Sequence, residues 1–144
     1  MSVYDPYLAA DHPAWRDLGV RQSDLEPLLA DSDAVSLHVP LDAGTRHLID
    51  AAALGRMRQD AVLINAARGG VVDERALAEA LREGRLGGAM LDVFETEPLP
   101  ADSVLAGVPN LILTPHIAGV SVESNVRVSA LIAANVRRAL QPTV

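Results

Sequence analysis

A chain of 144 residues, 49% of them hydrophobic, is long enough for one domain with a buried core. The 12 Lys and Arg residues are outnumbered by 19 Asp and Glu residues, so no positive face favours nucleic acid or an anionic membrane as a partner. The absence of cysteine excludes disulfides, thiolate nucleophiles and cysteine metal sites, and no apolar run approaches the roughly 18 residues of a membrane span. Because the amino terminus lacks a signal-peptide pattern, we expect a cytoplasmic protein that binds small molecules and no metal.

Short apolar runs alternate with helical patterns along the whole chain, which is typical of parallel strands connected by helices. Most runs are continuously apolar, which indicates strands that are covered on both faces. The sequence therefore predicts an α/β fold with a doubly wound parallel sheet. The predicted strands are Val3–Tyr4, Gly19–Arg21, Ala34–Val39, Ala61–Asn65, Ala89–Val93 and Leu111–Thr114.

Four helices are predicted from their capping residues and apolar spacing. Ser23 and Glu26 have the spacing of a capping box at the start of the first helix. Asp50 and Asp73 are expected to cap the second and third helices. The fourth helix is predicted to run from about Ser121 to Leu140, with acidic and basic residues placed at the ends that the helix dipole favours.

Polar residues follow five of the predicted strands. In an open parallel sheet, ligands bind at the carboxyl ends of the strands, so these residues are expected to meet at one edge. Together they provide an arginine, several carboxylates and two histidines, a set suited to a small anionic substrate and to proton transfer. This pattern indicates a site but not a particular reaction. The segments are Tyr4–Pro6, Leu37–Pro40, Asn65–Gly70, Leu91–Pro98 and Leu113–Gly119.

A family resemblance extends this interpretation. The chain contains LHVPLDAGTRHLID, INAARGGVVDERALAEALREG, GAMLDVFETEPLP and NLILTPHIAG, which resemble successive motifs of the D-isomer-specific 2-hydroxyacid dehydrogenases. The motifs have the family's order and spacing, and the resemblance extends from Val3 to about Leu140. It implies a Rossmann-like domain and an NAD-dependent oxidoreductase that acts on the CH–OH group of a small 2-hydroxy acid.

The resemblance implies three catalytic residues. Arg68 corresponds to the arginine that orients the substrate, and His116 corresponds to the histidine that exchanges the hydroxyl proton. Glu97 corresponds to the carboxylate that supports this histidine. Glu95 is a rival for that carboxylate, but the family pattern favours the residue directly before Pro98.

The resemblance also implies a set of cofactor-binding residues. Asp5 corresponds to the acidic residue that binds the adenosine ribose hydroxyls, and its charge would repel the phosphate of NADP, so NAD is favoured. Asp92 corresponds to the residue that contacts the nicotinamide carboxamide. The other residues expected to line the cofactor are Val39, Pro40, Thr45, Ala66, Ala67, Arg68, His116, Ala118 and Gly119.

Taken singly, these residues have ordinary structural alternatives. Asp5 before proline is more often a turn than a ribose ligand, and Arg68 before two glycines is usually part of a loop. Their joint order favours the functional interpretation. We expect His38 to be structural or to lie next to the cofactor, and His12 and His47 to be surface residues.

The GxGxxG loop of the family, expected about 20 residues before Asp5, does not occur in the sequence. We therefore expect residues 1–144 to form a partial dinucleotide-binding domain, truncated at its N-terminus. Such a domain lacks a central strand, the helix N-terminus that binds the pyrophosphate, and the family's separate substrate domain. Strand edges that are left unpaired are a further expected consequence.

Two hypotheses follow. The chain is a part of an NAD-dependent dehydrogenase whose full-length parent is a homodimer, or it is a catalytically inactive remnant or interaction module of the same fold. The stretch after His116 resembles (S)-sulfolactate dehydrogenase-like members, whereas phosphoglycerate and hydroxypyruvate/glyoxylate enzymes share the other motifs. The identity of the 2-hydroxy or 2-oxo acid substrate therefore stays open.

Overall fold

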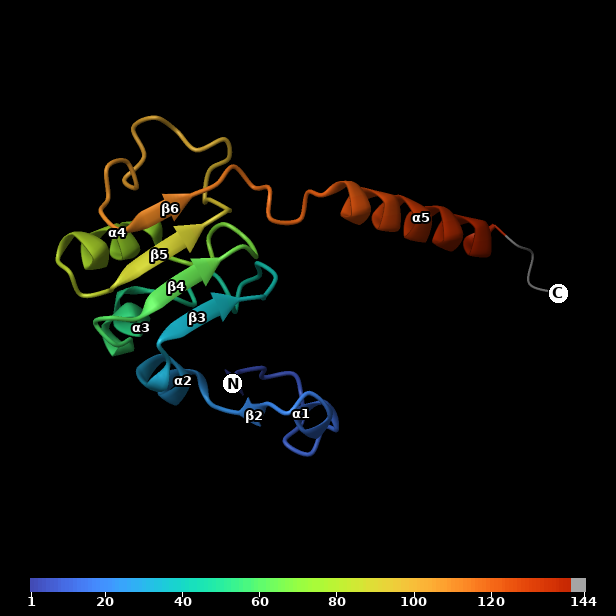
Figure 1. The fold of residues 1–144 in the computed structure, drawn as a ribbon, viewed down its shortest axis with the longest axis horizontal. Coiled ribbons are helices and arrows are strands. Elements are labelled where there is room, and N and C mark those ends of the chain that lie inside the picture. The colour runs from blue at the N-terminus through green and yellow to red at the C-terminus, as the bar shows by residue number, and fades with distance from the viewer. Residues whose placement is uncertain (141–144) are drawn as a thin grey trace.

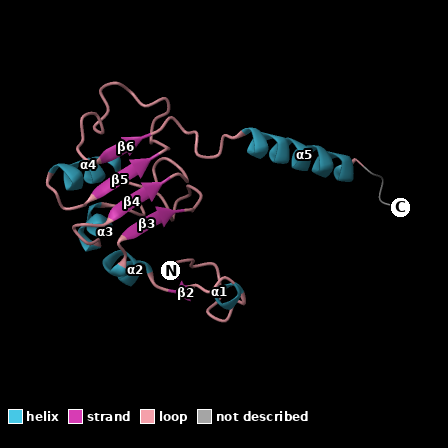
Figure 2. Ribbon diagram, viewed as in Figure 1, coloured by secondary structure: helices cyan, strands magenta, loops and turns pink. Residues whose placement is uncertain are grey.

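The computed structural model describes residues 1–140 and shows strands that alternate with helices, as the α/β prediction requires (Figures 1 and 2). The order of elements along the chain is the predicted one, with an additional short helix, α1, near the amino terminus. The elements are β1 (Ser2–Val3), α1 (Ala14–Asp17), β2 (Arg21–Gln22), α2 (Leu25–Asp31), β3 (Ala34–Leu37), α3 (Ala51–Arg56), β4 (Val62–Asn65), α4 (Glu74–Arg82), β5 (Gly88–Leu91), β6 (Leu111–Leu113) and α5 (Val122–Ala139).

The strands form two parallel sheets. Strands β3, β4, β5 and β6 lie side by side in chain order in a four-stranded sheet, and Leu37, Asn65, Leu91 and Leu113 are aligned across it. Strands β1 and β2 form a separate two-stranded sheet, and no backbone ladder joins it to β3 within residues 1–140. Because all pairings are parallel, the carboxyl ends of β3 to β6 lie at one edge, where the loops with the predicted site residues begin.

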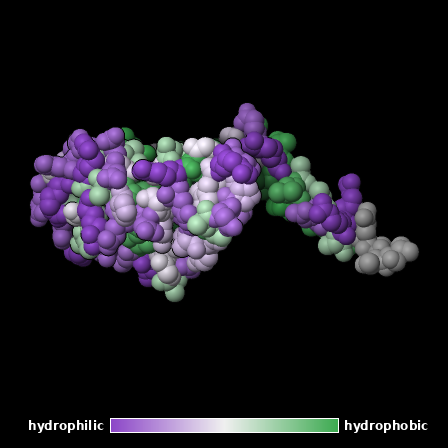
Figure 3. Space-filling view, turned by 90° about the horizontal axis from the view of Figure 1, so that it is seen from below, coloured by the Kyte–Doolittle hydropathy of each residue, from purple (hydrophilic) through white to green (hydrophobic). Residues whose placement is uncertain are grey.

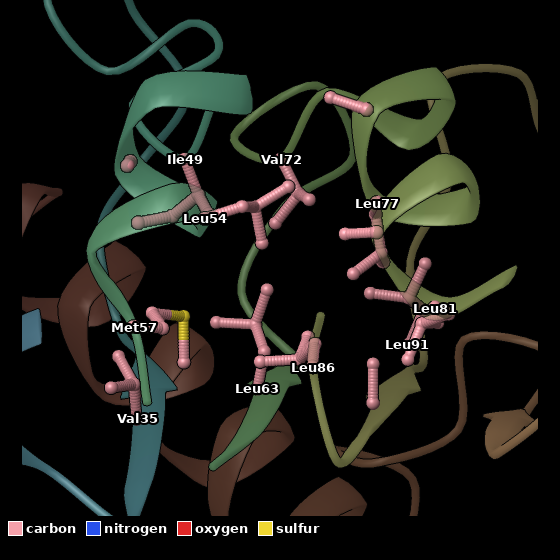
Figure 4. Packing of buried hydrophobic residues seen from close by; sticks show 14 of the residues in the cluster. Val35, Ile49, Leu54, Met57, Leu63, Val72, Leu77, Leu81, Leu86 and Leu91 are labelled. Carbon is pink, nitrogen blue, oxygen red and sulfur yellow. The ribbon is translucent and has the colours of Figure 1, made fainter. Parts of the chain in front are cut away.

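The core lies between the four-stranded sheet and helices α2, α3 and α4, which follow one another beside the strands (Figure 1). Leu63 of β4 and Leu77 of α4 are both 0% exposed, and Figure 4 shows them among other buried leucines. The exposed and buried residues of β3 alternate, with Val35 and Leu37 buried. The prediction that most strands are covered on both faces is therefore wrong for β3, because these helices cover only one face of the sheet.

Two local predictions need correction. Helix α2 is capped by Asp24, whereas the Ser23 hydroxyl donates to the carbonyl of Asp24, so the Ser23–Glu26 capping box does not form. No side-chain hydrogen bond closes this cap, and the third helical residue, Pro27, has no N–H to offer it. Strand β3 ends two residues before the predicted Val39, so the polar segment at its end begins earlier than expected.

Helix α5 has the predicted position and ends but projects away from the rest of the chain (Figures 1 and 3). The Ser121 hydroxyl caps it by accepting a hydrogen bond of 3.0 Å from the N–H of Ser124. Its apolar residues face solvent, and Leu131 is 61% exposed. Within the described residues, no helix has the length and apolarity needed to cross a membrane.

The core assignment predicts a difference between two leucines. Leu77→Ala should lower the free energy of unfolding by about 2–5 kcal/mol, because it leaves a cavity in the packed core. The matched variant Leu131→Ala, on exposed α5, should change it by less than about 1 kcal/mol. Equilibrium urea unfolding followed by circular dichroism measures both, and similar losses would contradict the placement of the core.

Candidate active site

Glu97 and His116 form a hydrogen-bonded pair at the carboxyl edge of the four-stranded sheet. The Nδ1 atom of His116 lies 2.8 Å from Oε2 of Glu97, and Oε1 of Glu97 accepts a hydrogen bond of 3.0 Å from the N–H of Phe94. Two hydrogen bonds hold the pKa of the Glu97 carboxyl below its ordinary value, and the one with His116 contributes more than the one from Phe94. The carboxylate that contacts His116 is therefore Glu97 rather than Glu95.

A buried carboxylate, Asp92, shapes the segment that carries His116. Asp92 is 1% exposed, and its Oδ1 atom accepts hydrogen bonds from the Thr114 hydroxyl (2.5 Å) and the N–H of Ile117 (2.9 Å). Its Oδ2 atom accepts a hydrogen bond of 2.8 Å from the N–H of Ala118. Burial raises the pKa of Asp92, but these three hydrogen bonds outweigh that effect, and the net pKa lies below the ordinary value.

His116 has a left-handed backbone conformation with φ of 55°, which is uncommon for a residue with a side chain. Its own N–H donates to the carbonyl of Thr114 at 3.0 Å. The N–H groups of the next two residues, Ile117 and Ala118, donate to the carboxylate of Asp92. The hydrogen bonds on either side of His116 therefore stabilise a conformation that directs its ring toward Glu97.

The Arg68 loop begins at Asn65, a polar residue that is 1% exposed at the end of β4. The amide of Asn65 donates to the carbonyl of Arg68 at 3.0 Å and accepts from the N–H of Ala67 at 3.1 Å, so it fixes the turn. The Arg68 side chain is exposed and donates to the carbonyl of Ala67. The sequence prediction missed Asn65 as a site residue, although an asparagine at the end of an apolar strand was its signal.

The Arg68 and Glu97 loops are in direct contact. A Cβ atom placed on Gly69 would lie 1.7 Å from the carbonyl oxygen of Phe94, so only glycine fits between the two loops. The structure thus brings the backbone next to Arg68 against the loop that holds Glu97. No hydrogen bond within residues 1–140 joins the Arg68 guanidinium to Glu97 or His116.

The predicted cofactor residues divide between the two sheets. Asp5 follows β1, where its Oδ1 atom accepts a hydrogen bond of 2.9 Å from the N–H of Tyr7. The Thr45 hydroxyl donates to the carbonyl of Pro40 at 2.7 Å. The remaining predicted residues follow strands of the larger sheet: Val39 and Pro40 follow β3, Ala66, Ala67 and Arg68 follow β4, Asp92 follows β5, and His116, Ala118 and Gly119 follow β6.

The other histidines have local partners. His38 Nε2 lies 2.9 Å from the Ser36 hydroxyl, and His12 Nδ1 accepts a hydrogen bond from the N–H of Ala14. His47 was expected to be a surface residue, and its side chain is 39% exposed. Its Nε2 atom lies 3.2 Å from Oε1 of Glu95, because the fold brings together two residues that are 48 positions apart.

An open parallel sheet with an imidazole–carboxylate pair at its carboxyl edge is typical of a dinucleotide-binding domain of an oxidoreductase. The family described as "D-isomer specific 2-hydroxyacid dehydrogenase, NAD binding domain" matches residues 1–118. The chain belongs to this family. Membership confirms the predicted family, the Rossmann-like fold and the NAD-binding class.

Individual relatives agree with this assignment. The chain is 62% identical over 138 residues to a protein named (S)-sulfolactate dehydrogenase from Chromohalobacter salexigens, covering 96% of this chain and 44% of the relative. The structure of a glyoxylate reductase from Paecilomyes thermophila superposes with a TM-score of 0.86 and 34% identity, covering 97% and 42% of the two chains. The structure of an acyclic imino acid reductase in complex with NADPH and D-Arg superposes with a TM-score of 0.85 and 30% identity, covering 97% of this chain and 43% of that chain. The chain thus spans less than half the length of these relatives.

The hydrogen bonds of Asp92 predict a measurable loss when its charge is removed. Asp92→Asn should lower the free energy of unfolding at neutral pH by about 1–3 kcal/mol. The NH₂ group of the asparagine would face an N–H or O–H donor of the chain, and neither could then form its hydrogen bond. Since the pKa of Asp92 is lowered by folding, its contribution is present above the ordinary carboxyl pKa and is lost as the pH falls through the lowered value.

The stability deficit of Asp92→Asn should therefore shrink as the medium is acidified, and urea unfolding at several pH values measures this. The matched control is Asp33→Asn, whose side chain is 88% exposed and whose replacement should change stability by less than about 0.5 kcal/mol. A deficit that is independent of pH would contradict the assignment of an ionised, buried Asp92.

Proposed function

We propose that the chain is the cofactor-binding and proton-transferring part of an NAD-dependent dehydrogenase that interconverts a small D-2-hydroxy acid and its 2-oxo acid. The observation that carries this proposal is the 2.8 Å contact between His116 and Glu97 in a chain of this family. The proposal extends to a homodimeric parent protein and a cytoplasmic location. Both rest on the family resemblance and on the composition of the sequence.

The proposal gives each catalytic side chain a role. Because Nδ1 of His116 is bonded to Glu97, Nε2 is the atom that accepts the hydroxyl proton of the substrate in the oxidative direction. The Glu97 carboxylate stabilises the imidazolium that results and fixes the ring orientation. Arg68 offers a planar pair of donors that matches the carboxylate of the substrate. In the reductive direction, Nε2 of His116 returns the proton to the carbonyl oxygen.

The residues at the strand ends fit a dinucleotide. The Oδ1 atom of Asp5 binds the N–H of Tyr7, and no donor within residues 1–140 occupies Oδ2, which could accept a ribose hydroxyl. The backbone at Gly119 is open, since a Cβ there would meet no atom within 4 Å. Asp5 would hold the adenosine ribose, and the segment after His116 would lie beside the nicotinamide, which supplies the hydride acceptor when bound.

The relatives suggest candidates for the substrate. The high identity to a protein named (S)-sulfolactate dehydrogenase supports a 2-hydroxy acid with a second acidic group, whereas the resemblance to a glyoxylate reductase supports a smaller acid. We place sulfopyruvate first, and glyoxylate and hydroxypyruvate next, in a panel of 2-oxo acids.

Turnover tests the role of His116. NADH oxidation by the full-length parent protein should be detectable with a member of the 2-oxo acid panel, and His116→Ala in that protein should lower kcat by about 10²–10⁴-fold because the proton donor is lost. The matched control is His12→Ala, in a residue outside the site that should leave kcat within about twofold. Unchanged turnover in His116→Ala would overturn the role of this residue. NADH binding without turnover by the unaltered parent protein would instead support the hypothesis of a non-catalytic module.

Cofactor preference tests the role of Asp5. The unaltered chain should bind NADH more tightly than NADPH, because the carboxylate of Asp5 repels the additional phosphate. Asp5→Asn should reduce this preference by about tenfold, which corresponds to about 1.4 kcal/mol. Titration of NADH and NADPH fluorescence measures both affinities. A preference unchanged by Asp5→Asn would contradict the ribose assignment.

A further inference from the structure

A second cluster of charged side chains lies next to the loop that holds Glu97. We name it the Glu95 cluster; it consists of His47, Glu74 and Glu95. The Nε2 atom of His47 lies 3.2 Å from Oε1 of Glu95. The same oxygen accepts a hydrogen bond of 3.4 Å from the N–H of Glu74, while the N–H of Glu95 donates to Oε1 of Glu74 at 2.7 Å. The cluster therefore joins three segments that are distant in the sequence.

His47 is fixed to the segment that follows Arg68. Its N–H donates to the carbonyl of Gly70 at 2.8 Å, and Ile49, two residues later, forms a parallel bridge with Val72. The φ of His47 is 50°, a left-handed conformation that turns the chain at this point. The imidazole therefore extends from the backbone next to the Arg68 loop to the Glu97 loop.

The backbone N–H of Glu74 donates to the carboxylate of Glu95, and the N–H of Glu95 donates to the carboxylate of Glu74. The two residues are therefore held together although their side chains have the same charge. Glu74 is the first residue of α4, so Glu95 places its negative charge at the positive end of the helix dipole. Burial, together with repulsion from Glu95 and Asp73, raises the pKa of Glu74, while the hydrogen bond from Glu95 and the charge of His47 oppose this rise. His47 and the helix end thus compensate for the proximity of the two carboxylates.

The Glu95 cluster gives the Glu97 loop a second point of attachment. The first is the close contact between Gly69 and the carbonyl of Phe94. Val93 and Phe94 are buried, and the hydrogen bonds of the adjacent Glu95 hold the exposed part of the loop that leads to Glu97. The N–H of Phe94, the residue directly before Glu95, donates to the Oε1 atom of Glu97. A movement of Glu95 would therefore displace the carboxylate that His116 contacts.

We propose that Glu95, held by His47 and Glu74, is a positioning residue that aligns Glu97 with His116 and fixes both beside the Arg68 loop. The catalytic meaning of this alignment rests on the proposed function, but the alignment itself does not. Within residues 1–140 the hydrogen-bond partners of the Glu95 carboxylate are His47 and Glu74 and not His116, so Glu95 is proposed to act through Glu97.

The alignment can be measured without turnover. In the unaltered chain, a ¹³C NMR titration of the Glu97 carboxyl should give a pKa below the ordinary glutamate value, because His116 donates to it. The charges that face Glu97 are those of His116 and Asp92, and Glu95→Ala changes neither. Glu95→Ala should nevertheless raise the Glu97 pKa toward the ordinary value, because the carboxylate no longer faces the imidazole.

Matched variants separate alignment from loss of charge and from unfolding. Glu95→Gln keeps an oxygen that accepts hydrogen bonds from Glu74 and His47. The Glu97 pKa should therefore stay close to its low value in this variant, in contrast to Glu95→Ala. His47→Asn tolerates the left-handed backbone and keeps the bonds between Glu74 and Glu95, so it should shift the pKa in the same direction as Glu95→Ala but less. The control Glu26→Ala removes an exposed partner of Arg56 and should shift nothing.

Kinetics provide a second readout. Glu95→Ala should lower kcat for 2-oxo acid reduction by about 10–100-fold while the KM for NADH changes by less than about twofold, because a misplaced acid–base pair affects the chemical step and not cofactor binding. A Glu97 pKa that stays low in both Glu95→Ala and His47→Asn would overturn the proposal. Absence of turnover in the unaltered full-length parent protein, together with the expected pKa shifts, would refute the proposed function and leave the positioning role intact.

Discussion

The geometry of the site depends on a carboxylate that has almost no contact with solvent. Asp92 is costly to bury, and the three donors that it accepts are what make its burial tolerable. Two of these donors are the N–H groups directly after His116, so the chain can satisfy Asp92 only if it turns at His116. The ionised state of Asp92 and the unusual backbone of His116 are therefore two aspects of one constraint.

This constraint also bears on the predicted contact between Asp92 and the nicotinamide carboxamide. An ionised carboxylate has about four lone-pair sites, and the chain already uses three of them. Any contact with a cofactor would have to use the remaining one while the other three stay in place. In this structure the Asp92 carboxylate binds donors of the chain around His116, and its contact with the cofactor stays a prediction.

The sequence predicted the parts of the structure whose signals are local. Strands β4 and β6, the helices α3 and α4 with their caps Asp50 and Asp73, and the extent of helix α5 all follow from patterns within one segment. The residues of the pair between Glu97 and His116 were identified only by the family resemblance, because no spacing rule connects residues 19 positions apart. The contact between them became visible in the structure.

The features that were missed depend on contacts between distant segments. His47 was interpreted as a surface residue because no carboxylate motif stands beside it in the sequence. Its partner Glu95 is 48 positions away, and the bridge between Ile49 and Val72 brings the loop of His47 to it. The capping box at Ser23 failed for a local reason, since the helix begins one residue later than the box requires and the Ser23 hydroxyl donates to the carbonyl of Asp24. The alternation of exposed and buried residues in β3 had a local signal that was overlooked, because the polar Ser36 stands between the buried Val35 and Leu37.

Glu95 and Glu97 show how the fold assigns different roles to two chemically identical side chains. They stand two positions apart, each within reach of one histidine, and the sequence alone left them as rivals for the same role. The contact of Gly69 with Phe94, the residue before Glu95, prevents the loop from shifting by the two positions that would exchange their partners. Because one carboxylate is held at the end of α4, the other is free to face the imidazole that reaches the edge of the sheet. The distinction between the two residues therefore arises from the packing of a glycine against a backbone carbonyl and not from their own chemistry.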